Sequence, residues 1–190
     1  MHIFTPRFFG GNGIVSAQVP LGAGIALAMK YLERPAATSA LYGDGASNQG
    51  QVFEAFNMAK LWDLPCVFVC ENNKYGMGTF AERSSSNTEY FTCGDKTPGI
   101  QANGMDIIAS AQAAKYARDW VIAVKGPLLL EFVMYRYGGH SSIFLFYKET
   151  NTNDKSRMSD PGITYRTRKE VQRMRSTQDP IRGLQHYIEE

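Results

Sequence analysis

Apolar and polar residues alternate along the chain in blocks that predict strands and helices in turn. Short apolar runs at residues 38–42, 66–70 and 128–134 predict three buried strands. Apolar residues at helical spacing predict helices at 20–31, at 49–61 and from the N-cap Asp106 to about Trp120. The expected apolar faces are Leu21, Ile25 and Leu27 in the first helix, Val52, Phe53, Phe56 and Ala59 in the second, and Ile107, Ala111, Ala114 and Tyr116 in the third.

Strands that alternate with helices of about ten or more residues are typical of a parallel sheet with helices on its faces. The predicted fold class is therefore α/β, with a parallel sheet flanked by helices. Ligands in such folds bind at the carboxyl ends of the strands. The chemistry is accordingly expected in the segments that follow the three strands, namely Gly43-Asp44-Gly45, residues 72–78 and residues 135–140.

Composition places the chain among ordinary folded proteins. Hydrophobic residues make up 44% and charged residues 20% of its 190 residues, which argues against general disorder. Twenty Lys and Arg against 18 Asp and Glu give a net charge of +2, so neither a nucleic-acid nor a membrane-surface partner is expected. The start of the chain reads as neither a signal peptide nor a transit peptide, and we expect a soluble protein.

The cysteines and a basic stretch have ordinary structural explanations. Cys66 and Cys70 lie in a predicted buried strand at a spacing unlike that of zinc ligands, and Cys93 makes the count odd. We expect buried, reduced, inert thiols and therefore a reducing compartment. The basic residues of 165–175 are expected on a solvated or interface helix, because aromatic residues are not interleaved with them as nucleic-acid binding requires.

Asp44 and Asn73 are the strongest candidates for a metal site. A Gly-Asp-Gly segment or an Asn-Asn pair alone is most often a turn. Adjacent parallel strands, however, would place both side-chain oxygens at one end of the sheet, where Mg²⁺ could take them and leave room for phosphate oxygens. Ala46 and Ser47 are expected at a helix start, whose free N–H groups favour phosphate. The chemistry indicates a magnesium–diphosphate site.

Several motifs carry a resemblance to a known family. Gly43-Asp44-Gly45, a spacer of 26 residues and Asn72-Asn73 are similar to the thiamine diphosphate signature. The wider segments Leu41-Tyr42-Gly43-Asp44-Gly45-Ala46-Ser47-Asn48-Gln49-Gly50, Glu71-Asn72-Asn73-Lys74-Tyr75-Gly76-Met77-Gly78-Thr79 and Tyr135-Arg136-Tyr137-Gly138-Gly139-His140-Ser141 resemble the alpha subunits of 2-oxo acid dehydrogenases, above all those that act on pyruvate. So do Gly10-Gly11-Asn12-Gly13-Ile14-Val15 and Met158-Ser159-Asp160-Pro161-Gly162.

The resemblance implies a thiamine diphosphate-binding fold and a set of site residues. Mg²⁺ would be bound by the side chains of Asp44 and Asn73 and by the backbone carbonyl of Tyr75. His140 would lie by the thiazolium ring, although on its own it reads as an ordinary loop histidine. The implied cofactor-binding residues are Gly13, Val15, Asp44, Gly45, Ala46, Asn73, Tyr75 and His140, and the implied phosphorylation sites are Ser141 and Ser159, for which loop serines with no role remain the alternative.

By the same resemblance the expected function is oxidative decarboxylation of pyruvate, with transfer of the acetyl unit to a lipoyl group. The implied partners are a beta subunit in a heterotetramer, the lipoyl domain of an acetyltransferase, and a regulatory kinase and phosphatase. A mitochondrial matrix address is implied as well. Two alternatives stay open: an alpha subunit for another 2-oxo acid, branched-chain acids or acetoin, and an inactive pseudo-subunit that binds the beta chain.

The chain also departs from the family pattern. Relatives continue beyond both of its ends, so the resemblance covers a fragment of one domain, 1–190, in which 163–190 would begin a C-terminal helical region. In relatives His-Ser runs directly into Met-Ser-Asp-Pro-Gly, whereas here residues 142–157 intervene. These residues are expected to be an inserted loop, either a true extension or the product of a retained intron or gene-model error.

Overall fold

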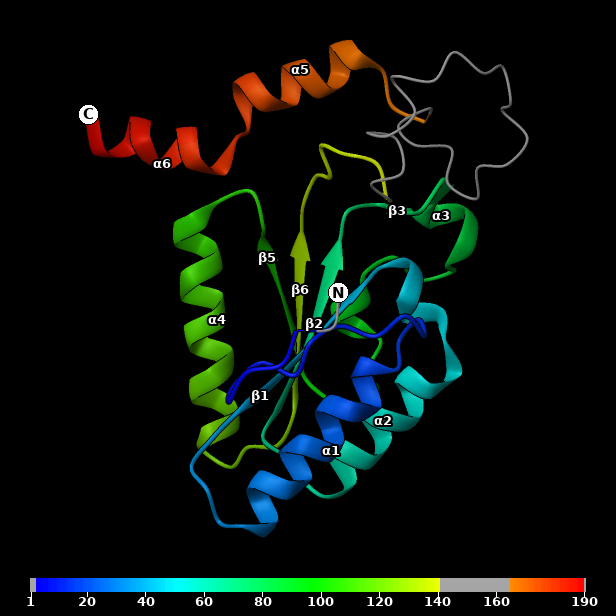
Figure 1. The fold of residues 1–190 in the computed structure, drawn as a ribbon, viewed down its shortest axis with the longest axis vertical. Helices are drawn as coiled ribbons and strands as arrows, with labels where there is room; N and C mark the ends of the chain where they lie inside the picture. The colour runs from blue at the N-terminus through cyan, green and yellow to red at the C-terminus, as the bar shows by residue number, and fades with distance from the viewer. Residues whose placement is uncertain (1–2, 141–164, 190) are drawn as a thin grey trace.

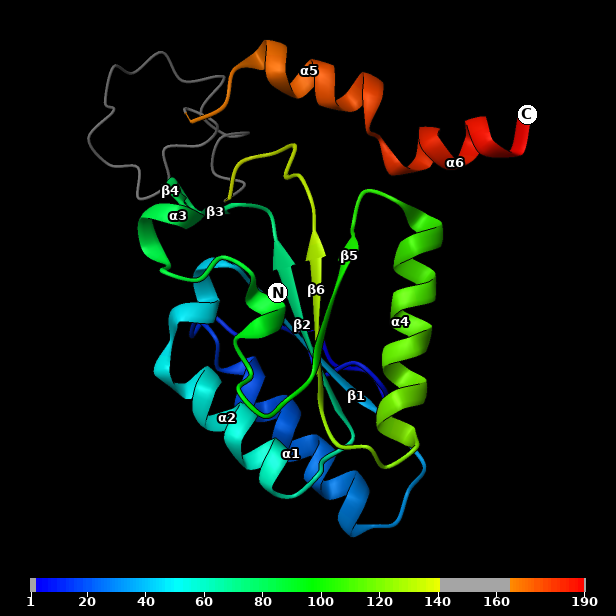
Figure 2. The ribbon, with the colours of Figure 1, turned by 180° about the vertical axis from the view of Figure 1, so that it is seen from behind.

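The computed structural model describes residues 3–140 and 165–189. A parallel four-stranded sheet in the order β1-β2-β6-β5 forms its centre, as predicted from the alternation of strands and helices. Helices α1 and α2 cover one face and α4 covers the other, whereas α5 and α6 lie beyond the carboxyl ends of the strands (Figures 1 and 2).

The elements have the following bounds. The strands of the sheet are β1 Thr38–Gly43, β2 Cys66–Asn72, β5 Gly99–Asn103 and β6 Leu128–Val133, and a small hairpin is formed by β3 Tyr75–Gly76 and β4 Thr79–Phe80. The helices are α1 Gln18–Tyr31, α2 Gly50–Leu61, α3 Ala81–Ser84, α4 Ile107–Ile122, α5 Arg168–Thr177 and α6 Pro180–Glu189, with 3₁₀ turns η1 Gly45–Asn48 and η2 Tyr90–Thr92. No helix in the described ranges is long and apolar enough to cross a bilayer.

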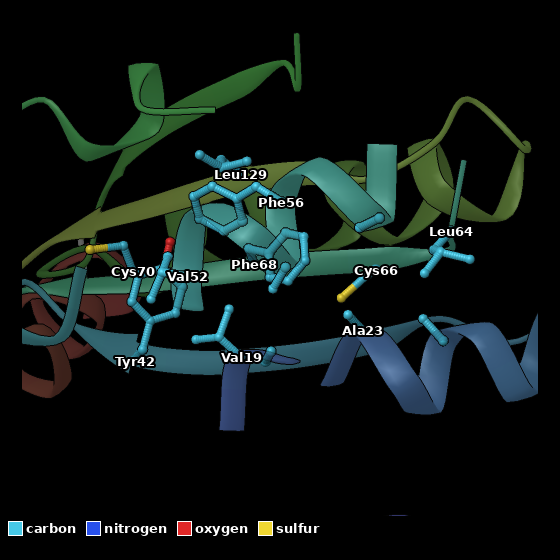
Figure 3. Packing of buried hydrophobic residues seen from close by; sticks show 14 of the residues in the cluster. Val19, Ala23, Tyr42, Val52, Phe56, Leu64, Cys66, Phe68, Cys70 and Leu129 are labelled. Atoms are coloured by element: carbon cyan, nitrogen blue, oxygen red, sulfur yellow. The ribbon is translucent and has the colours of Figure 1, made fainter. Parts of the chain in front are cut away.

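The core consists of two layers, one on each face of the sheet. Along β2, Cys66, Phe68 and Cys70 face α1 and α2, whereas Val67 and Val69 face α4. This alternation follows from the two-residue repeat of a strand, and both faces are apolar because helices cover both. Phe56 of α2 packs on Phe68 with 4.7 Å between ring centroids (Figure 3). The free thiols of Cys66 and Cys70 are buried, as expected.

The predicted helix faces were partly wrong. In α1 the buried side chains are small, Val19, Ala23 and Ala26, whereas the predicted Leu21 and Leu27 are 48% and 42% exposed. Gly22 explains the close approach, because a Cβ there would lie 2.6 Å from Ala40 Cβ. The prediction placed the large apolar residues on the buried face, but a helix lying this close to the sheet requires small residues there.

The other two helices differ from prediction in a similar way. In α2 Val52, Phe56 and Ala59 are buried as predicted, but Phe53 is exposed. In α4 the predicted Ile107, Ala111, Ala114 and Tyr116 are all exposed, and the helix packs through Ala117 and Val121. Alanines around the whole circumference of α4 leave little contrast between its faces, so the pattern did not identify the buried one. The Asp106 N-cap is confirmed: its Oδ1 accepts from Ile108 N and Ala109 N at 2.8 and 3.0 Å.

Candidate functional site

Asp44 lies directly after β1, in the turn that joins the sheet to η1. Its side chain is 2% exposed, and its Oδ2 has no hydrogen-bond partner among the described residues. Burial raises the pKa of this carboxyl, while hydrogen bonds from the backbone N–H groups of Asp44 and Asn73 and the charges of Arg136 and Lys74 oppose the rise. A buried carboxylate oxygen without a partner is costly, and a cation is the usual compensation.

Asn73 lies in the turn after the neighbouring strand, β2, and Tyr75 begins β3 directly after that turn. Strands β1 and β2 are parallel with Gly43 opposite Glu71, so this turn and the Asp44 turn lie at the same end of the sheet, as predicted. Asn73 Oδ1 lies 3.0 Å from the Tyr75 carbonyl oxygen, which places two acceptors face to face. Rotating the amide by 180° would let Asn73 donate to that carbonyl and accept from Arg136 at 2.8 Å.

The two turns touch through glycines. A Cβ on Gly45 would lie 2.9 Å from Gly76 Cα, and one on Gly76 would lie 3.1 Å from Gly45 Cα. Only residues without side chains allow this backbone contact. The contact brings the Asp44 turn against the segment that follows Tyr75.

The N-terminal segment joins the same region. Ser16 is buried at a φ of 69° and its Oγ donates to the Ala46 carbonyl at 2.7 Å. Gln51 Nε2 donates to the Val15 carbonyl at 2.9 Å. The segment that contains Gly13 and Val15 is therefore anchored beside η1, with both residues exposed. One expectation is corrected here: Ala46 and Ser47 lie in the 3₁₀ turn η1, and α2 begins only at Gly50.

One arginine that the sequence analysis did not assign to the site supports these turns. Arg166 is 7% exposed and donates to the carbonyl oxygens of Asn73, at 3.0 Å, and of Arg136. Its guanidinium lies 4.0 Å from the ring centroid of Tyr135 and 4.9 Å from that of Tyr75. The prediction of a solvated or interface basic helix over 165–175 does not describe this residue, which precedes α5 and is buried within the chain. Its contact with Asn73 spans 93 positions of sequence, which no local pattern can indicate.

The remaining predicted residues fall at the end of the described chain or beyond it. His140 is exposed, in the stretch that follows β6 at the same end of the sheet. Ser141, Ser159 and the 142–157 segment lie outside the described residues. Within the described residues, 3–140 and 165–189, no three His, Cys, Asp or Glu side chains are grouped so that they could hold a metal ion. A cation bound by the predicted residues would therefore have one carboxylate, one amide and one backbone carbonyl as its protein ligands.

Comparison with known proteins decides the family. The family model described as "Dehydrogenase E1 component" matches residues 1–190, the whole chain. The chain belongs to the dehydrogenase E1 component family. Members of this family use thiamine diphosphate, and the parallel sheet flanked by helices is the thiamine diphosphate-binding domain that the motifs predicted.

Similar curated proteins carry a more specific name. The mitochondrial pyruvate dehydrogenase E1 component subunit alpha of Schizosaccharomyces pombe is 60% identical over 190 residues, which is 100% of this chain and 42% of the relative. The Saccharomyces cerevisiae subunit is 60% identical over 188 residues, 99% of this chain and 41% of the relative. The testis-specific form of Rattus norvegicus is 56% identical over 181 residues, 95% of this chain and 42% of the relative. The chain thus spans about two fifths of the length of these relatives.

Proposed function

We propose that this chain is part of the alpha subunit of a pyruvate dehydrogenase and carries the metal and diphosphate half of its thiamine diphosphate site. The observation that supports this most is the 60% identity, across all 190 residues, to an alpha subunit of that name. The reaction would be oxidative decarboxylation of pyruvate, with the acetyl unit passed to a lipoyl group. When bound, thiamine diphosphate supplies the electron sink for decarboxylation.

The oxygen donors of the site fit Mg²⁺. Asp44 Oδ2 is buried and unpaired, and the Asn73 side-chain amide lies 3.0 Å from the Tyr75 carbonyl oxygen. Mg²⁺ prefers oxygen ligands at about 2.1 Å in octahedral geometry, which puts neighbouring ligands about 3.0 Å apart. Three protein oxygens would leave the other positions to diphosphate and water. We therefore assign the metal to Asp44, Asn73 and the Tyr75 carbonyl.

Backbone groups would hold the diphosphate. Gly45 and Ala46 open the η1 turn beside Asp44, and the close contact of Gly45 with Gly76 keeps side chains out of this space. The segment with Gly13 and Val15, anchored to η1 through Ser16, would contact the cofactor through its backbone. His140 would be the side chain by the reactive ring, where an imidazole can hold or move a proton.

The expected partners and subcellular location follow from the same proposal. We propose a beta subunit in a heterotetramer, a lipoyl domain of an acetyltransferase as acceptor, and the mitochondrial matrix as location, since the relatives are mitochondrial subunits alpha. A kinase and phosphatase would act on Ser141 and Ser159, where phosphate adds about −1.5 to −2 charges. Such charge near a bound diphosphate would inhibit by repulsion.

The test is cofactor binding in the complex of this chain with a beta subunit. Asp44→Asn keeps the shape of the side chain but removes the charge, so thiamine diphosphate binding measured by calorimetry should lose its dependence on Mg²⁺. Wild-type affinity in this variant would overturn the metal assignment. Turnover rates measured with the wild-type complex identify the substrate: CO₂ release is followed for pyruvate and branched-chain oxo acids, and carbon–carbon cleavage for acetoin, which has no carboxyl group to lose. Beta-subunit association without thiamine diphosphate uptake would mean an inactive subunit instead.

A further inference from the structure

Glu131 is a buried carboxylate that the proposed function does not use. It lies in β6 with an exposed fraction of 0%, between Cys70 of β2 and Gln101 of β5 in the register of the sheet. In the described part of the chain the ion pairs are surface pairs, and none includes Glu131. A carboxylate buried in the sheet without a cation costs folding free energy, so its retention requires a compensating role.

Three neutral donors surround the carboxylate. Asn72 Nδ2 donates to its Oε1 at 2.6 Å, and the Phe91 N–H and Gln101 Nε2 donate to its Oε2 at 3.1 and 3.3 Å. An ionised carboxylate accepts only, so it satisfies all three, whereas a neutral amide in its place would turn a donor toward one of them. The surroundings therefore select a charged, accepting group.

The bond to Asn72 fixes the orientation of that amide. Because Asn72 Nδ2 faces Glu131, its Oδ1 is left to accept from the backbone N–H of Lys74 at 3.1 Å. Lys74 has a φ of 71°, a left-handed conformation that is unfavourable for a residue with a side chain and needs local hydrogen bonds to persist. Lys74 is the residue between Asn73 and Tyr75, the two proposed metal ligands of this turn.

We propose that Glu131 is a positioning residue for the cation site, acting through Asn72 to hold the Asn73–Tyr75 turn in its strained shape. The inference rests on the proposed function for the identity of the bound ion. The path is continuous: carboxylate to amide, amide oxygen to Lys74 N–H, and Lys74 to the ligands on either side. Glu131 itself has no contact with the ligands and is not a catalytic residue.

An exchange of polarity between the two side chains provides the test. Glu131→Gln places a donor against Asn72 or against Phe91 N, so one buried pair must clash or break. Adding Asn72→Asp moves the carboxylate to position 72, where it can accept from the new amide at 131 and from Lys74 N at once. The charge of the pair is unchanged, and every donor again has an acceptor. Glu54→Gln, the same chemical change at an exposed site on α2, is the control.

The variants are compared in the complex with the beta subunit by calorimetry with Mg²⁺ and thiamine diphosphate, and by hydrogen exchange of the 72–76 region without them. We expect Glu131→Gln to weaken Mg²⁺-dependent binding by roughly tenfold to a hundredfold, the loss expected for an unsatisfied buried group. It should also speed exchange at 72–76. The double variant should recover both properties, and Glu54→Gln should match wild type.

The proposal is overturned if Glu131→Gln matches Glu54→Gln in both measurements, or if the double variant is no better than Glu131→Gln alone. Should Glu131→Gln fail to assemble, assembly of the double variant supports the proposal and its failure contradicts it. A wild-type complex that does not bind thiamine diphosphate would instead refute the proposed function. The exchange measurement would still decide the role of Glu131, because it uses the metal-free complex.

Discussion

Replacing Arg166 by methionine tests whether the residues before α5 support the cation site. Methionine preserves much of the length and apolar contact of the arginine stem but cannot donate to the carbonyls of Asn73 and Arg136. Each hydrogen bond from a charged donor contributes about 1.5–3 kcal/mol, and a guanidinium on an aromatic ring adds about 0.5–1 kcal/mol. The total loss is about 3.5–7 kcal/mol before water replaces part of it.

Only part of this loss reaches the metal, because Arg166 bonds the Asn73 backbone rather than its side chain. We expect the Mg²⁺ requirement for thiamine diphosphate binding to rise about tenfold to a hundredfold, which corresponds to about 1.4–2.8 kcal/mol. Arg166→Lys should fall between wild type and Arg166→Met, since an ammonium lacks the planar fork that reaches two carbonyls.

The assay is a Mg²⁺ titration of the complex at fixed thiamine diphosphate, read by calorimetry. Arg168→Met is the matched control, because Arg168 is exposed two residues further along and loses the same charge. An Mg²⁺ requirement for Arg166→Met equal to that of Arg168→Met would show that Arg166 does not support the site.

Two further predictions concern the first turn. Gly45→Ala should move the Asp44 turn away from Gly76 and weaken cofactor binding at a cost of about 1–3 kcal/mol. Gly43→Ala is the control and should bind normally, because the added Cβ meets nothing within 4 Å. Equal binding by the two variants would refute the close packing of the turns. Asp44→Asn should raise the melting temperature of the metal-free complex at neutral pH by about 2–4 °C per 1 kcal/mol of relieved burial cost. The pKa of Asp44 is raised in the folded state, so the ionised side chain destabilises the fold above that pKa, and this effect fades as the pH falls toward the ordinary pKa of an aspartate. The rise in melting temperature caused by Asp44→Asn should therefore shrink in acid. Thermal unfolding measured across pH checks this, and a rise that grows in acid would contradict it.

Local pattern was sufficient to locate three of the four strands of the described sheet and the approximate bounds of α1, α2 and α4. β2 and β6 are buried on both faces and are correspondingly rich in apolar residues, whereas β1 is buried on one face only and exposes Leu41 on the other. β5, Gly99–Asn103, was not predicted, because it lies at the edge of the sheet and contains a glycine, a glutamine and an asparagine. Pairing with β6, rather than its own residues, makes it a strand.

The residues of the candidate site were likewise predictable only in part. Asp44 and Asn73 each follow a strand, so the rule that ligands bind at the carboxyl ends of parallel strands was sufficient to place them together. Arg166 could not be found, because a contact across 93 positions depends on the fold. Glu131 left a signal that was not used: a charge in the middle of an apolar strand must be buried, and a buried charge needs partners.

The proposed ligands of magnesium, Asp44, Asn73 and the Tyr75 carbonyl, are tested most directly by a calorimetric titration. Thiamine diphosphate is titrated into the complex of this chain with its beta subunit, with and without Mg²⁺. We expect saturable binding that requires Mg²⁺ in the wild type and that loses this dependence in Asp44→Asn. Binding by the wild type that is indifferent to Mg²⁺, or the same Mg²⁺ dependence in Asp44→Asn, would contradict this assignment.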